Sequence, residues 1–243
     1  MDYDNPAFRL FTILGQGKLI DGRTKCLVAW AELLDVEPDS PELLAKMGKV
    51  MELPSQTVAA LLSSNPYQED TTNHWLKQVQ VAFESQVLGS TWTTFIDRID
   101  THSITYLQLH SQLIQGARKR KALDSGDLDS AKLELDEVLQ FLLNSESIDS
   151  EVRVALARNL RRLITAIDEY RLTGSTAIFD SIEILFGHSY FDLKYAEVIR
   201  ESTTGKRIAD IVSVLANSMT IALGLPPISE SVKGFLSYVK AAT

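Results

Sequence analysis

The chain has 243 residues, of which 45% are hydrophobic and 23% charged, and its formal net charge is −8. The apolar content argues against wholesale disorder, and the acidic balance argues against a general nucleic-acid binder, whose affinity depends on neutralising phosphates. Cys26 is the single cysteine, which excludes an intramolecular disulfide and a cysteine-built zinc site, and its apolar neighbours predict that it is buried.

The beginning of the chain predicts a small acidic helical subdomain over residues 1–64. Its apolar clusters lie at residues 26–34, 41–51 and 54–62. Pro41 and Pro54 each suit the first turn of a helix, and acidic side chains outnumber basic ones in this region. The polar, turn-rich stretch 65–73 is the predicted linker to the rest of the chain.

The main domain is predicted over residues 74–243. Apolar residues recur there at helical spacing, and no hairpin signal separates alternating apolar runs. The helical face that begins at Trp75 points away from the face that follows Gly89–Thr91, so we predict a break there. The later helices are predicted at residues 103–121, 127–143, 151–172, 176–186, 190–201, 205–224 and 229–241. The predicted fold is therefore all-α, an irregular multi-helix bundle of about ten to twelve helices.

The stretch Arg158–Gly187 resembles a pattern seen in uncharacterised helical proteins of bacteria. The residues that carry the resemblance are Arg161-Arg162-Leu163, Ile167-Asp168-Glu169-Tyr170-Arg171, Gly174 and the helix from Ile182 to Gly187. The resemblance implies a bacterial origin and an α-helical fold, and it carries over no activity and no site residues.

A basic run stands at the predicted end of a helix and is a candidate contact for an anion or a partner. It consists of Arg118, Lys119, Arg120 and Lys121. Cations at a helix C-terminus also complement the helix dipole, which is the structural alternative. The run has no interleaved aromatic residues, so it gives little support for nucleic-acid binding.

Three arginines, Arg158, Arg161 and Arg162, share the polar side of one predicted helix. Like charges four residues apart repel each other on a helix, so we expect an acidic group to face them. The predicted internal partners on the preceding helix are Glu134, Asp136 and Glu137. The functional alternative is an arginine face that binds an acidic partner or a phosphate.

The segment 208–225 is apolar over about two-thirds of its helical circumference. Its apolar side consists of Ile208, Ile211, Val212, Leu215, Met219 and Leu223. As a helix, the segment would be nearly as long as the hydrocarbon core of a bilayer is thick, so these residues are candidate membrane or oligomer contacts. Asp210, Ser213 and Asn217 make a permanent membrane span costly, and the alternative is a helix in the protein core.

Asp97, Asp100 and His102 form the best candidate for a carboxylate–histidine site, near a predicted helix end. The structural alternative is that these residues form a solvated helix terminus with no metal-binding or acid–base role. The Gly15–Lys18 and Thr204–Lys206 stretches lack the remaining residues of a phosphate-binding loop. The sequence therefore assigns no catalytic, cofactor-binding or metal-binding residue, and no cofactor.

These patterns predict a non-enzymatic bacterial interaction or regulatory protein of the cytoplasm, which acts by binding another protein or a second copy of itself. One alternative is a membrane-perturbing effector that uses the apolar helices of residues 205–241. A second alternative is a hydrolase with a site assembled from carboxylates and histidines.

Overall fold

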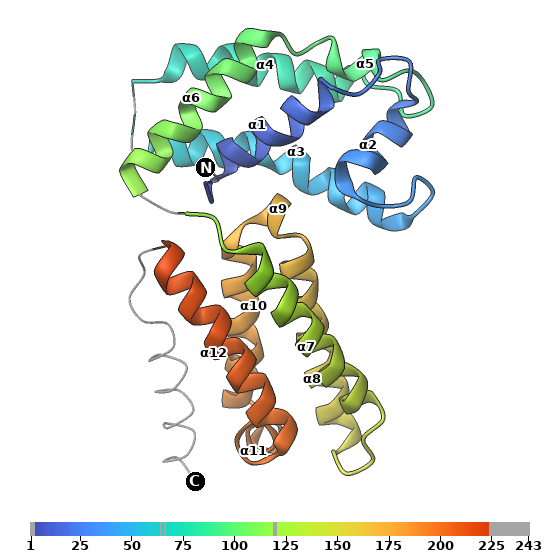
Figure 1. Cartoon of the computed structure of the whole chain (residues 1–243), viewed down its shortest axis with the longest axis vertical. Helices are drawn as coiled ribbons and strands as arrows, with labels where there is room; N and C mark the ends of the chain where they lie inside the picture. Colours follow the sequence, from blue (N-terminus) through green and yellow to red (C-terminus); the bar gives the residue numbers. More distant parts are fainter. Residues whose placement is uncertain (1–2, 64, 66, 119–120, 224–243) are drawn as a thin grey trace. The chain divides into compact units, whose positions relative to one another are not determined.

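A computed structural model describes all residues except 1–2, 64, 66, 119–120 and 224–243, and the side chains of Arg118 and Leu223 also lie outside the description. Over the described residues the chain forms twelve α-helices and one 3₁₀ helix, with no β-strand, which confirms the all-α prediction. The chain divides into two compact units, Met1–Arg120 and Lys121–Thr243 (Figure 1). The predicted helix 229–241 lies outside the described residues.

The first unit is built around α1, which packs against both α3 and α6, while α4 packs against α6. The helices of this unit are α1 (Pro6–Gly17), α2 (Cys26–Leu34), α3 (Pro41–Leu62), α4 (Glu69–Ser85), α5 (Thr93–Ile96) and α6 (Thr101–Arg118). This division differs from the predicted boundary at 65–73. The polar stretch there contains the first turn of α4, and α1 joins the helices on both sides of it into one unit.

The predicted break at Gly89–Thr91 is confirmed, because α4 ends at Ser85 and α5 begins at Thr93. Between them the chain passes the N-terminus of α2, where the Ser90 carbonyl accepts from the Cys26 N–H at 2.8 Å. The first N–H groups of a helix have no partner within the helix, so this segment satisfies them. Cys26 is fully buried as predicted, and burial raises the pKa of its thiol to about 11.

His110 of α6 is a buried, hydrogen-bonded histidine in the first unit. The Trp75 indole N–H donates to His110 Nδ1 at 3.1 Å, so Nε2 carries the proton and donates to Thr71 Oγ1, also at 3.1 Å. Burial lowers the pKa of His110 to about 4, because removal from water disfavours the charged imidazolium. His110 is therefore neutral at pH 7 and links α4 to α6.

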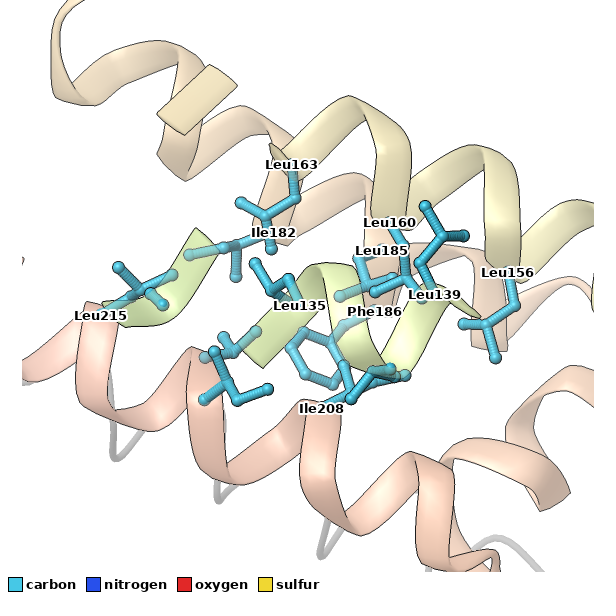
Figure 2. Packing of buried hydrophobic residues seen from close by; sticks show 14 of the residues in the cluster. Leu135, Leu139, Leu156, Leu160, Leu163, Ile182, Leu185, Phe186, Ile208 and Leu215 are labelled. Carbon is cyan, nitrogen blue, oxygen red and sulfur yellow. The ribbon is translucent and has the colours of Figure 1, made fainter. Parts of the chain in front are cut away.

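The second unit is a bundle in which each long helix packs against its neighbours around one core. Its helices are α7 (Ser125–Leu143), α8 (Ser150–Asp168), α9 (Tyr170–Thr173), α10 (Ser175–Gly187), the 3₁₀ helix η1 (His188–Tyr190), α11 (Leu193–Glu201) and α12 (Thr203–Leu223). Leucine and isoleucine side chains from α7, α8, α10 and α12 meet in this core (Figure 2). Asp124 and Asp149 cap the N-termini of α7 and α8 with their carboxylates.

Two glycines are required where the chain of the second unit turns. Gly174 has a φ of 71° between α9 and α10, a left-handed conformation that side chains with a Cβ rarely adopt. Gly205 lies in the first turn of α12, where an added Cβ would overlap the carbonyl oxygens of Val198 and Ile199 in α11. The absence of a side chain at Gly205 thus permits the close approach of α11 and α12.

We predict that the stability of the first unit depends on the protonation of His110. Between pH 6.5 and 4 the unfolded chain binds a proton that the folded chain excludes. The free energy of unfolding therefore falls by up to about 3 kcal/mol as the pH drops through this window, and this loss ends below about pH 4. Urea unfolding of wild type and His110→Gln at several pH values measures the effect, because the carboxylates titrate in both proteins. The exposed His102→Gln variant should retain the wild-type pH dependence, and equal pH dependence in all three proteins would contradict the prediction.

We also predict that Gly205→Ala destabilises the second unit by about 1–3 kcal/mol, because the new methyl group must displace backbone at the α11–α12 junction. Gly187→Ala is the matched control. A Cβ at Gly187 meets no atom within 4 Å, so that variant should be neutral or slightly stabilised by the helix propensity of alanine. Chemical denaturation measures both, and equal effects of the two substitutions would show that Gly205 has no special role.

Candidate functional site

Arg158, Arg161 and Arg162 are all exposed on α8, and none of them forms an ion pair with a described residue. Carboxylates of the preceding helix were predicted to neutralise these arginines. For Glu137 this prediction is wrong. Glu137 of α7 instead pairs with Arg207 of α12 at 3.1 Å. The reason is that α7 also packs against α12, so part of its acidic side faces that helix. The three arginines remain a candidate contact for an anion or a partner.

The basic run is mostly outside the described residues. The Arg118 side chain, Lys119 and Arg120 belong to that part of the chain, and Lys121 is exposed. The Lys121 backbone N–H donates to the Ala222 carbonyl at 2.8 Å, which ties the start of the second unit to the last turn of α12.

The described residues of the predicted apolar side of α12 lie in the core of the second unit, whereas Val214 and Ile221 of the same helix are exposed. Ile208, Ile211, Val212, Leu215 and Met219 are buried there, and the Leu223 side chain is outside the described residues (Figure 2). Contact of these side chains with a membrane or a second copy would therefore require the bundle to open. In the described part of the chain, no helix combines the length and the apolar character needed to cross a bilayer.

The candidate cluster Asp97, Asp100 and His102 does not assemble as predicted. Asp97 and His102 are exposed, whereas Asp100 Oδ2 lies within hydrogen-bond distance of His74 Nε2 of α4, at 3.1 Å. Asp100 also precedes α6 and accepts from the Ser103 N–H at 2.7 Å, as an N-cap residue does. The packing of α4 on α6 brings His74 to this helix end, so Asp100 contacts His74.

Hydrogen bonds explain the electrostatics of Asp100. Partial burial by itself would raise the pKa of this carboxyl, but hydrogen bonds from Gln78, Ser103 and His74 outweigh it and hold the pKa well below its usual range. Asp100 is therefore a permanently charged structural group. Among the described residues, no group of three or more histidine, cysteine or carboxylate side chains is placed to hold a metal ion.

Among the described residues of the second unit, the most exposed apolar group lies at the connection between α10 and α11. Tyr190, Phe191 and Leu193 expose 56, 91 and 80% of their surfaces. Large apolar side chains that gather in water on one connection mark a binding surface more often than single exposed residues do. We call these three residues the apolar corner.

Local capping and a buried tyrosine hold the apolar corner in place. Asp192 accepts from the Tyr195 N–H at 3.1 Å and caps α11 between Phe191 and Leu193. Tyr195 is buried in the core, where its hydroxyl donates to the Leu185 carbonyl at 3.0 Å and accepts from the Asn159 amide at 3.2 Å. Burial raises the pKa of Tyr195 to about 12. The aromatic ring that enters the core at this connection is thus that of Tyr195, and the side chains of Phe191 and Leu193 remain exposed to solvent.

A shallow pocket of about 550 Å³ adjoins the apolar corner, between it and the N-terminus of α8. Charged groups at its border are Asp149, Glu151, Asp192 and Lys194. Lys194 pairs with Asp149 at 3.2 Å, and this hydrogen bond lowers the pKa of Asp149 and raises that of Lys194. The apolar corner therefore has a charged border with an excess of carboxylates.

The apolar corner is not predicted from the sequence, whose periodicity places residues 190–201 in one helix. A signal is nevertheless present in Tyr190-Phe191-Asp192, where two consecutive aromatic residues precede an aspartate that caps the following helix. An aromatic pair just outside a helix start has no helical face to join, so its burial depends on neighbours that the sequence does not identify.

Comparison with known proteins gives no assignment: the chain matches no protein family, no curated protein and no solved structure.

We predict that Tyr195→Phe destabilises the second unit by about 1–2 kcal/mol, because the Leu185 carbonyl and the Asn159 amide lose their partner in the core. The matched control is Thr176→Val, which removes an exposed hydroxyl from α10 and should change the free energy of unfolding by less than about 0.5 kcal/mol. Urea unfolding compares the variants, and an unchanged stability of Tyr195→Phe would contradict the anchoring role.

Proposed function

We propose that the chain is a non-enzymatic protein that acts by binding another protein through the apolar corner of its second unit. The observation that carries this proposal is the exposure of Phe191 and Leu193 on a connection whose α11 end is fixed by the Asp192 cap. Burying either side chain in an interface would contribute roughly 1.5–3 kcal/mol. Their fixed backbone reduces the entropy lost on binding, which favours such side chains as interface anchors.

The charged border supports a protein partner of a particular kind. Glu151 and Asp192 flank the apolar side chains, and the charge of Asp149 is balanced by Lys194. A partner surface that places a basic side chain beside an apolar one would match both features. The exposed arginines of α8 belong to the same unit and offer a further contact for acidic groups of the partner.

The test compares the wild-type chain with the double variant Phe191→Ser/Leu193→Ser. Each tagged protein is cross-linked to its neighbours in the cells of origin, and a captured protein is identified, purified and titrated against each variant by calorimetry. We expect the substitutions to raise the dissociation constant by roughly 100-fold or more, because two anchor residues are removed.

The matched control is Leu133→Ser/Val154→Ser, which replaces two exposed apolar residues elsewhere on the second unit. This variant should bind the partner with the wild-type dissociation constant. If the wild-type chain retains no protein, or if the corner variant binds as well as wild type, the proposal is wrong.

A further inference from the structure

The pocket beside the apolar corner brings an open aromatic ring together with carboxylates. Phe191 and Leu193 line it from the connection between α10 and α11, and Glu151 lines it from the first turn of α8. Phe191 exposes 91% of its surface, so its ring is open to a group that enters the pocket. Such a group therefore meets an aromatic ring and negative charge at the same site.

The charges around this pocket do not balance. Among the described residues that line it, Lys194 is the one lysine or arginine. The hydrogen bond from Lys194 to Asp149 raises the pKa of the lysine, and the charges of Asp149, Glu151 and Asp192 raise it further. One ammonium group thus lies among three carboxylates, which leaves a formal charge of −2 when His188 is counted as neutral.

Two of these carboxylates are available to a partner. Glu151 is exposed and forms no ion pair with a described residue. Asp192 Oδ1 accepts from the Tyr195 N–H at 3.1 Å, which leaves Oδ2 for a second donor. Asp149, in contrast, already binds Lys194 at 3.2 Å and caps α8. The unbalanced charge of the pocket therefore lies with Glu151 and Asp192.

A guanidinium group matches these surroundings better than an ammonium group does. It is planar and weakly hydrated, so it stacks on an aromatic ring, and its N–H donors can serve two carboxylates at once. An ammonium group is a compact and strongly hydrated charge, and Lys194 already supplies one. Arginine is also enriched among the residues that contribute most to binding at protein interfaces.

We infer that an arginine side chain of the partner protein occupies this pocket, with its guanidinium group on the Phe191 ring and its N–H groups directed at Glu151 and Asp192. An apolar side chain next to that arginine then contacts Leu193. The inference rests on the proposed function, because it states which side chain of the partner the apolar corner receives.

Nuclear magnetic resonance of the isotope-labelled full chain tests the inference with two synthetic peptides, acetyl-Arg-Leu-amide and acetyl-Gln-Leu-amide. We expect the arginine peptide to shift the amide signals of Glu151, Asp192 and Leu193. It should bind at least about fivefold more tightly than the glutamine peptide, because only a cation gains from the two carboxylates.

A charge-neutral variant and a matched control locate the effect. Glu151→Gln/Asp192→Asn should reduce the affinity for the arginine peptide to that for the glutamine peptide. Asparagine retains an oxygen that caps α11, so this variant should fold, and circular dichroism checks that it does. Asp129→Asn/Glu134→Gln removes two exposed carboxylates of α7 and changes the net charge equally, so it should bind the arginine peptide as the wild type does.

The outcomes separate the arginine pocket from the proposed function. Equal affinity for the two peptides, no saturable shift with the arginine peptide, or wild-type affinity of the charge-neutral variant for that peptide would overturn the arginine pocket. A partner protein whose affinity falls with Phe191→Ser/Leu193→Ser would in that case still support binding through the apolar corner.

Discussion

Burial of the apolar face of α12 closes the second unit, and the arrangement of its other helices depends on this packing. Ile208, Val212 and Leu215 lie in the same core as Leu135 and Leu139 of α7 (Figure 2). Each fully buried aliphatic side chain contributes roughly 1.5–3 kcal/mol, so removal of α12 would expose α7 at a cost that a domain of this size cannot offset. Gly205 permits this closure, because α12 begins in direct contact with the last carbonyls of α11.

This packing decides which apolar residues remain available for binding. On α12, Ile208, Ile211, Val212, Leu215 and Met219 are enclosed, whereas Val214 and Ile221 are exposed. Exposed apolar residues instead lie where other side chains already fill the neighbouring core. At the apolar corner Tyr195 fills that core, and on α3 the core side of the helix is occupied by residues such as Val50 and Leu53.

The polar interactions of the chain serve mainly to fix helix ends and helix pairs. Asp100 caps α6 and contacts His74, Asp192 caps α11, and Asp149 caps α8 while it contacts Lys194. His110 joins α4 to α6 as a neutral acceptor and donor. Asp149 and Asp192 hold the surface on which the proposed interactions depend, since a capped connection exposes its side chains in one fixed geometry.

Periodicity predicted most helices, and the apolar neighbours of Cys26 predicted its burial, because helix formation and the amphipathic face depend on residues that are near one another in the sequence. For Val212 and Leu215 the sequence left open whether they contact the core, a membrane or a second copy, and the structure places them in the core. The positions of charged side chains were predicted less well. Arg158, Arg161 and Arg162 were correctly placed on one polar face, but the contact of Glu137 with Arg207 depends on a helix some 70 residues away. The same is true of Asp100, whose partner His74 comes from α4.

The sequence by itself determined that the chain is helical and which side of each long helix is apolar, since both follow from local spacing. Only the tertiary structure decided where the two units divide, which apolar side chains remain exposed, and which charges are paired. These properties depend on packing between helices that are distant in the sequence. Met51, half of whose surface is exposed, and Val50, which is fully buried, are adjacent apolar residues of α3, and packing against other helices decides which of the two is covered.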